Sequence, residues 1–252
     1  MPQSADLAQH LKPFVYETLS TKAMHFSICE IQSRMQTQQP DALSLEYTRT
    51  MMAFMLFAPQ PDMLAMIGLG GGSMAKFCFR FLPMTRIKVI EINPHVIALR
   101  DEFFVPPDGA RFKVQLGNGA DFVRFPPYRL DVLLVDGFDY DGQPPALCSQ
   151  RFYDDCFDAL QPNGLMVVNL HAGHADFDLH VARIRRSFGV EVLLVTDADG
   201  CNTIAFACKG LLAGRFKPAS AGHPAHLSAQ ARVELSPAFL AVTRALKVKA
   251  LA

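Results

Sequence analysis

A glycine-rich turn between two apolar runs restricts the fold of this chain more than any other feature. Residues 63–67 lead into G-L-G-G-G at 68–72, a helical apolar pattern follows, and a second apolar run at 87–92 contains Glu91. This order predicts a compact β-α-β unit that binds a nucleotide. Closely spaced glycines let the backbone approach a ligand, and a carboxylate after the next strand can accept both hydroxyls of a ribose. We therefore expect a ligand that contains adenosine.

The spacing of the glycines narrows the ligand further. Gly68, Gly70 and Gly72 form G-x-G-x-G, in which the third glycine comes one residue earlier than in the G-x-G-x-x-G turn of dinucleotide enzymes. A G-x-G-x-G turn commonly accommodates the methionine part of an S-adenosyl ligand. A tight strand-to-helix turn without a ligand is the alternative, and Glu91 favours the binding interpretation.

Composition limits the class of protein and its partners. The chain has 252 residues, of which 50% are hydrophobic and 19% are charged, enough for one large α/β core. The formal net charge is +0, so charge gives no reason to expect a nucleic acid or an acidic membrane as partner. The longest apolar stretch, residues 51–58, is too short to cross a bilayer.

The cysteines and the N-terminus predict a cytoplasmic protein without a metal. The six cysteines are scattered, with no C-x-x-C pair and no spacing typical of metal ligands. Free, buried thiols in a reducing compartment are the expectation. The first ten residues show no pattern of a signal peptide.

Patterns along the chain predict three regions: a small β-hairpin region at 1–42, an α/β domain at 43–212, and a tail at 213–252 with one amphipathic helix near 238–249. Strands are expected at 63–67, 87–92, 112–116, 131–136, 165–170, 190–196 and 203–208. Helices are expected at 44–57, 73–81, 95–104, 120–124, 149–160 and 177–188. This alternation predicts a doubly wound, mostly parallel sheet with antiparallel last strands and residues 131–136 at its centre.

Four strand ends carry residues suited to a binding site. In a sheet of this kind, ligands bind beyond the carboxyl ends of the strands. The glycine turn, Glu91, Asn118 and Asp136 are all expected at that edge. Their combination is more specific than any single motif.

The ordered motifs L-E-Y-T-R-T-M, M-I-G-L-G-G-G-S, V-I-E-I-N-P-H-V-I, L-G-N-G-A-D-F, D-V-L-L-V-D-G-F-D and L-C-S-Q-R-F-Y-D-D-C-F-D-A-L-Q-P-N-G resemble the spermidine synthase (aminopropyltransferase) family. The chain looks closest to the bacterial spermidine synthase-like branch, and the resemblance covers roughly residues 31–210. It implies the S-adenosylmethionine-dependent methyltransferase fold, a small N-terminal β domain and a homodimer.

The resemblance assigns a nucleoside site. Glu91 would hold the ribose hydroxyls, and the turn with Gly68, Gly70 and Gly72 would flank the methionine-derived chain. Asn118 stands where the family usually has an aspartate that meets the adenine amino group, and Gly119 would complete this wall. An amide oxygen accepts the same hydrogen bond, although G-N-G is also a common turn.

The resemblance also assigns an amine site. Asp136 matches the catalytic acid of the family, and Asp139 matches the second aspartate of its D-x-x-D loop. An amine must lose a proton before it attacks the carbon next to a sulfonium, so Asp136 is the expected general base. Tyr47 and Gln32 align with residues that line the amine pocket. A core aromatic and a surface strand residue are their alternative roles.

Three departures fall in the part that recognises amines. Gly71 replaces an aspartate that holds the aminopropyl ammonium in the family, and Tyr140 replaces a proline of the D-x-x-D loop. The tyrosine that precedes the final strand has no counterpart. Losing one charge-assisted contact costs roughly 1.5 to 3 kcal/mol, enough to weaken or redirect recognition of the decarboxylated ligand.

Three functions remain open at this stage. The first is transfer of an aminopropyl group from decarboxylated S-adenosylmethionine to a small-molecule amine. The second is methyl transfer from S-adenosylmethionine, and the third is a non-catalytic nucleoside-binding homologue. His171 and His174 follow the strand at 165–170 and either shuttle a proton or make ordinary loop contacts.

Overall fold

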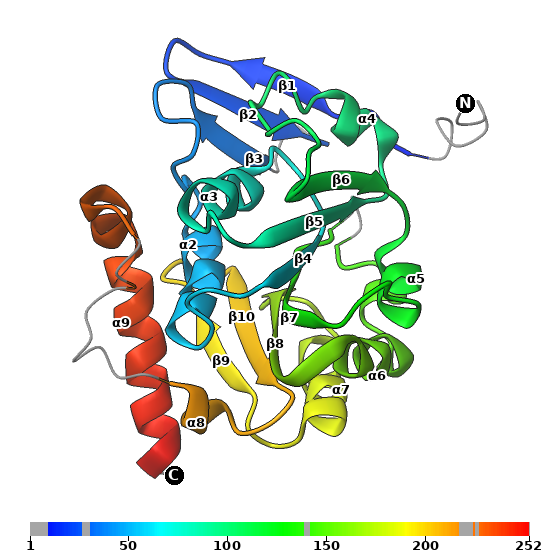
Figure 1. The fold of residues 1–252 in the computed structure, drawn as a ribbon, viewed down its shortest axis with the longest axis vertical. Helices are drawn as coiled ribbons and strands as arrows, with labels where there is room; N and C mark the ends of the chain where they lie inside the picture. The colour runs from blue at the N-terminus through cyan, green and yellow to red at the C-terminus, as the bar shows by residue number, and fades with distance from the viewer. Residues whose placement is uncertain (1–9, 27–30, 139–141, 217–223, 225–226, 252) are drawn as a thin grey trace.

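The computed structural model describes residues 10–26, 31–138, 142–216, 224 and 227–251. Two sheets make up its frame, one of three strands and one of seven (Figure 1). Asp139 and Tyr140, which the sequence singles out, lie outside the described residues, as does Cys29. None of the other five cysteines forms a disulfide within the described residues, and all but Cys201 are buried.

The large sheet has the strand order β6-β5-β4-β7-β8-β10-β9. Its first five strands are parallel, and β10 runs antiparallel to both neighbours, as the sequence predicts. The central strand is β7, whose residues 132–135 are buried on both faces. The strands are β4 (Met63–Ile67), β5 (Arg86–Glu91), β6 (Phe112–Leu116), β7 (Leu130–Val135), β8 (Leu160–His171), β9 (Leu193–Thr196) and β10 (Asn202–Cys208).

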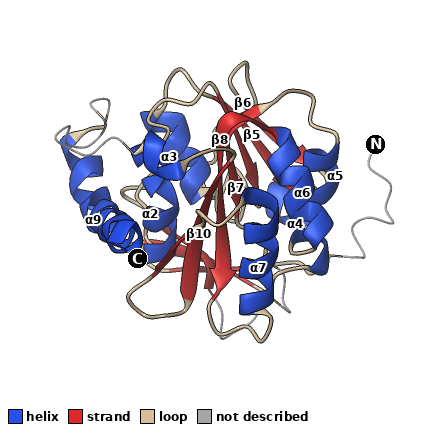
Figure 2. Ribbon diagram, turned by 90° about the horizontal axis from the view of Figure 1, so that it is seen from below, coloured by secondary structure: helices blue, strands red, loops and turns tan. Residues whose placement is uncertain are grey.

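Helices cover both faces of this sheet (Figure 2). Because successive side chains of a strand point to opposite faces, Leu64 and Met66 of β4 join one core, while Ala65 and Ile67 join the other. The first core includes α2 (Glu46–Met52), η1 (Ala53–Leu56), α3 (Ser73–Phe81) and α9 (Ala229–Leu251). The second includes α5 (Gly119–Arg124), α6 (Gln150–Ala159) and α7 (Phe177–Phe188). The doubly wound fold is thereby confirmed.

The small sheet is antiparallel, with the order β1-β2-β3. Its strands are β1 (Phe14–Glu17), β2 (Thr21–His25) and β3 (Ile31–Gln36), so a third strand extends the expected hairpin. Ser33 and Met35 of β3 are buried, while Gln32 and Arg34 between and beside them are half-buried. The buried face of β3 lies against α3.

The helix expected at 44–57 is divided between α2 and η1, and two other predicted helices differ more strongly in their bounds. The helix expected at 95–104 ends early, as α4 (Pro94–Ala98), because Phe103 and Val105 are buried as part of an irregular segment. The tail helix α9 begins at Ala229 and continues past Pro237. Leu235, Phe239 and Val242 are buried in the core shared with α2 and η1, and this burial holds the helix together around the proline.

The tail also contacts the segment that leads into α2. A carboxylate oxygen of Glu234 accepts a hydrogen bond from the Leu43 N–H, and Arg49 donates to the Leu43 carbonyl at 2.6 Å. The remaining short elements are η2 (Pro145–Leu147) and α8 (Leu212–Arg215). Within the described part of the chain, no helix has the length and apolarity that a membrane crossing requires.

Candidate active site

A cavity of about 870 Å³ opens at the carboxyl ends of the parallel strands. It lies where the strand order reverses between β4 and β7, the usual ligand position in a doubly wound sheet. Eight of the predicted site residues line it, namely Gln32, Tyr47, Gly68, Gly70, Glu91, Asn118, Gly119 and Asp136. Gly72 does not line it but caps the start of α3 with φ 69°.

Gly68 lets β4 and β7 end side by side. Its φ is +96°, and a Cβ added there would lie 2.2 Å from the carbonyl oxygen of Asp136. Only glycine fits such a contact without moving the backbone. The first glycine of the turn therefore sets the position of Asp136 on the neighbouring strand.

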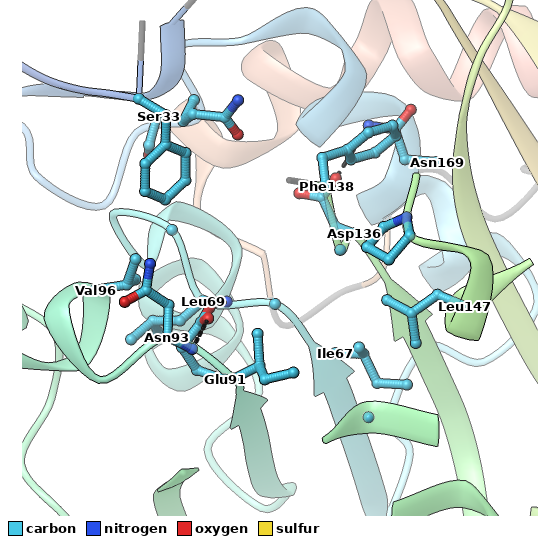
Figure 3. A pocket seen from close by; sticks show the side chains of 18 of the residues that line it. Ser33, Ile67, Leu69, Glu91, Asn93, Val96, Asp136, Phe138, Leu147 and Asn169 are labelled. Atoms are coloured by element: carbon cyan, nitrogen blue, oxygen red, sulfur yellow. Dashed lines mark hydrogen bonds between the residues drawn. The ribbon is translucent and has the colours of Figure 1, made fainter. Parts of the chain in front are cut away.

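Glu91 braces the glycine turn. Its Oε2 accepts a hydrogen bond from the Leu69 N–H at 2.8 Å, and its Oε1 accepts one from the Asn93 N–H at 2.8 Å (Figure 3). The residue is 7% exposed, and burial raises the pKa of its carboxyl although these N–H groups oppose the shift. Each oxygen keeps a lone pair, so the carboxylate can also accept two ligand hydroxyls.

Asn118 has a structural role, in agreement with the alternative interpretation of G-N-G as a turn. Its Oδ1 accepts a hydrogen bond from the Ala120 N–H at 2.8 Å and so caps the N-terminus of α5. The side chain also borders the cavity. The second lone pair of its oxygen and its NH₂ group are suited to hydrogen bonds with adenine. Adenine binding by Asn118 stays a prediction.

Asp136 receives one hydrogen bond on each oxygen. Asn169 Nδ2 donates to Oδ1 at 3.0 Å, and the Tyr47 hydroxyl donates to Oδ2 at 3.1 Å. Figure 3 labels Asp136 and Asn169 together on one side of the cavity. Burial raises the pKa of the Asp136 carboxyl, while the two donors oppose this rise.

Tyr47 acts here only as a donor. Burial, and then the charge of Asp136, raise the pKa of its hydroxyl well above the ordinary value. The phenol therefore keeps its proton while Asp136 is charged. Tyr47 borders the cavity, and its role in an amine pocket stays a prediction.

The sequence interpretation missed Asn169. This residue is 3% exposed, and its Oδ1 has no hydrogen-bond partner in the described part of the chain. Its position in the sequence could have indicated it, because Asn169 lies near the carboxyl end of β8. This strand pairs with β7, which Asp136 directly follows. Asn169 borders the cavity, and its NH₂ group helps to orient the Asp136 carboxylate there.

His171 and His174 both border the cavity. Nδ1 of His174 accepts a hydrogen bond from the Asp176 N–H at 3.0 Å, and its ring stacks on His180 at 5.5 Å between centroids. His174, Asp176 and His180 offer possible metal-ligand atoms within 4.8 Å of one another. The hydrogen bond engages Nδ1 of His174, so its Nε2 is the ring nitrogen that remains for a metal, and burial lowers the pKa of His180.

The fold and the cavity define a doubly wound α/β protein of the methyltransferase-like class with a site at the strand switch point. Residues 44–184 match the family model described as "Spermine/spermidine synthase domain". The chain belongs to the spermine/spermidine synthase family.

Individual proteins agree with this assignment. A polyamine aminopropyltransferase of Chromobacterium violaceum is 34% identical over 194 residues, which are 77% of this chain and 74% of that protein. A probable spermidine synthase from Corynebacterium glutamicum has a TM-score of 0.68 at 22% identity and covers 79% of this chain and 77% of its own. Human methyltransferase-like protein 13, solved with SAH, has a TM-score of 0.60 at 21% identity, with 79% and 93% covered. The two solved structures bear on the fold alone.

Proposed function

We propose that the protein transfers an aminopropyl group from decarboxylated S-adenosylmethionine to a small-molecule amine. The observation that carries the proposal is the Asp136 carboxylate, which Asn169 and Tyr47 orient at the edge of the cavity beside the glycine turn. The polyamine aminopropyltransferases to which the chain is similar support the same reaction.

The reaction needs one base and one oriented electrophile. Asp136 attracts the ammonium of the acceptor and takes one proton from it. The freed nitrogen lone pair attacks the carbon next to the sulfonium, the C–S bond breaks, and its electrons neutralise the sulfur. Methylthioadenosine leaves, and the proton on Asp136 passes to solvent.

The other residues divide between the two substrates. We assign Glu91, Asn118, Gly119 and the glycine turn to the nucleoside, and Gln32, Tyr47 and Asp139 to the amine. Glu91 supports the first assignment because both of its oxygens are already oriented by backbone N–H groups. The hydrogen bond from the Tyr47 hydroxyl to the Asp136 carboxylate supports the second.

Methyl transfer from S-adenosylmethionine is the second candidate, and Gly71 is the observation that favours it. Without a carboxylate on the turn, the charge that would select a decarboxylated ligand is missing at this position. Turnover with each sulfonium ligand separates the two candidates, because one reaction releases methylthioadenosine and the other releases S-adenosylhomocysteine.

The Asp136→Asn variant tests the proposal. Transfer to a panel of amines should fall by about 10² to 10⁴-fold, the usual contribution of a general base. Binding of methylthioadenosine, measured by titration calorimetry, should stay within twofold of wild type. Equal transfer in the variant would refute the role of Asp136, and absence of transfer in both proteins would favour the non-catalytic homologue.

Several expectations from the sequence remain predictions. They are a homodimer, a cytoplasmic location, the absence of a metal and of nucleic-acid or membrane partners, and the domain limits 1–42, 43–212 and 213–252. Sedimentation analysis and metal analysis of the purified protein test two of them directly.

A further inference from the structure

The small sheet closes the glycine turn on one side. A Cβ added to Gly71 would lie 2.6 Å from Ser33 Oγ and 2.8 Å from Cδ1 of Phe103. Phe103 is fully buried, so this wall cannot yield without moving the core. A side chain at position 71 would therefore require Ser33 and Phe103 to move.

Ser33 lies directly over the turn. Its side chain borders the cavity, its Oγ would be 3.9 Å from a Cβ at Gly70, and the residue is only 6% exposed. Figure 3 labels Ser33 on the side of the cavity occupied by Leu69, away from Leu147. Across residues 10–26, 31–138 and 142–216, its hydroxyl has no hydrogen-bond partner. A polar group at this depth that lacks a protein partner is suited to a ligand.

One buried ammonium holds both walls of this subsite. Lys76 Nζ donates to the Phe103 carbonyl at 2.8 Å and lies 3.1 Å from Sδ of Met35. Met35 is two residues from Ser33 on β3, and both face the core side of the strand. Lys76 therefore holds the β3 backbone and Phe103 in place on either side of Ser33 before a ligand binds, which favours a specific contact.

We propose that the Ser33 hydroxyl binds the amino end of the donor's three-carbon chain, and that as a neutral group it discriminates little between the decarboxylated and the carboxylated donor. This inference rests on the proposed function. A hydroxyl is neutral and both accepts and donates, so it binds the ammonium of decarboxylated S-adenosylmethionine and equally meets a carboxylate. The protein should then bind decarboxylated S-adenosylmethionine and S-adenosylmethionine with dissociation constants within about tenfold of each other. The reason is that the two complexes differ at this hydroxyl by no more than one hydrogen bond.

Titration calorimetry on the full chain tests this inference with three ligands. These are the two sulfonium compounds and methylthioadenosine, which lacks the amino end of the chain. Ser33→Ala should weaken binding of decarboxylated S-adenosylmethionine about tenfold, as expected for one hydrogen bond to a charged group. Binding of methylthioadenosine should stay within twofold.

A charged variant and its isosteric control sharpen the test. Ser33→Asp should shift the preference toward the decarboxylated ligand at least about tenfold relative to Ser33→Asn, because only the aspartate adds a charge. Unchanged binding of all three ligands to Ser33→Ala would overturn the inference, and so would an equal loss for methylthioadenosine. These titrations need no turnover, so failure of the transfer reaction and failure of the Ser33 contact are separate outcomes.

Discussion

The Tyr47 hydroxyl donates a hydrogen bond to Oδ2 of Asp136 at 3.1 Å, although the two residues are 89 positions apart in the chain. Tyr47 lies on α2, and Asp136 directly follows the central strand β7. The contact therefore joins a helix on one face of the sheet to the strand edge where the cavity opens. It also favours the charged form of Asp136, which is the form that a general base requires.

Tyr47→Phe should change the pH dependence of transfer. The base works deprotonated, so kcat/KM falls as the pH drops through the pKa of Asp136, which burial raises. Loss of the phenol removes a donor to the carboxylate, and the acidic limb of the profile should move to higher pH by about one unit. Tyr16→Phe, at an exposed position on β1, is the matched control and should leave the profile unchanged. A shift to lower pH would contradict this role of Tyr47.

Glu91→Gln should weaken nucleoside binding. In the wild type, the carboxylate accepts hydrogen bonds from the N–H groups of Leu69 and Asn93. The amide keeps only one acceptor oxygen, so its NH₂ group faces one of these two N–H groups, and that hydrogen bond is lost. We expect methylthioadenosine to bind at least about tenfold more weakly, which corresponds to losing one charge-assisted hydrogen bond. Glu102→Gln, which alters a side chain that is 53% exposed, is the control for calorimetry. Equal affinity in the two variants would exclude Glu91 from the nucleoside site.

Gly68→Ala should destabilise the protein by more than backbone strain alone. The positive φ costs about 1 kcal/mol, and the contact with the Asp136 carbonyl adds a forced movement of β7. Gly200→Ala isolates the strain, because φ there is +74° and no atom lies within 4 Å of the added Cβ. Urea unfolding should show a larger loss for Gly68→Ala than for Gly200→Ala. Similar losses would mean that the strand edge relaxes freely.

Lys76 should make the stability depend on pH in the alkaline range. Lys76 is 1% exposed, and burial lowers the pKa of its ammonium from 10.5 to about 8. Between these values the unfolded chain keeps a proton that the folded chain has lost, so the free energy of unfolding rises with pH. The total rise is on the order of 3 kcal/mol, from the difference between the pKa values of 10.5 and about 8.

Lys76→Met lacks this titration and isolates it. The difference in unfolding free energy between wild type and variant should shift in favour of wild type as the pH increases from about 8 to 10.5. Urea melts at three pH values across this range measure the shift. A difference that stays constant with pH would mean that Lys76 is solvated in the folded protein.

Local patterns in the sequence predicted most of the sheet. β4, α3, β6 and α7 match their expected bounds, because apolar runs, glycines and prolines define these elements within a few residues of chain. The helix expected at 95–104 was too long, since Phe103 and Val105 are buried by contacts from other elements. The early start of α9 likewise depends on packing against α2 and η1.

The site was predictable where strand ends alone determine it. Glu91, Asn118 and Asp136 reach one cavity because parallel strands end at one edge. Asn169 follows the same rule but belongs to no motif that the resemblance supplied. The position of Ser33 over Gly71 depends on how the small sheet sits against α3, and that arrangement leaves no periodic signal in the sequence.

The Leu43 N–H donates a hydrogen bond to Glu234, and this contact links the C-terminal helix α9 to the segment that leads into α2. Leu43 precedes α2 by three residues, and α2 carries the phenol that orients the proposed base. No described residue of α9 lines the cavity, yet this helix holds the segment that leads into α2. Removal of residues 229–251 should therefore disturb the position of Tyr47 without removing a residue that lines the cavity in the described part of the chain.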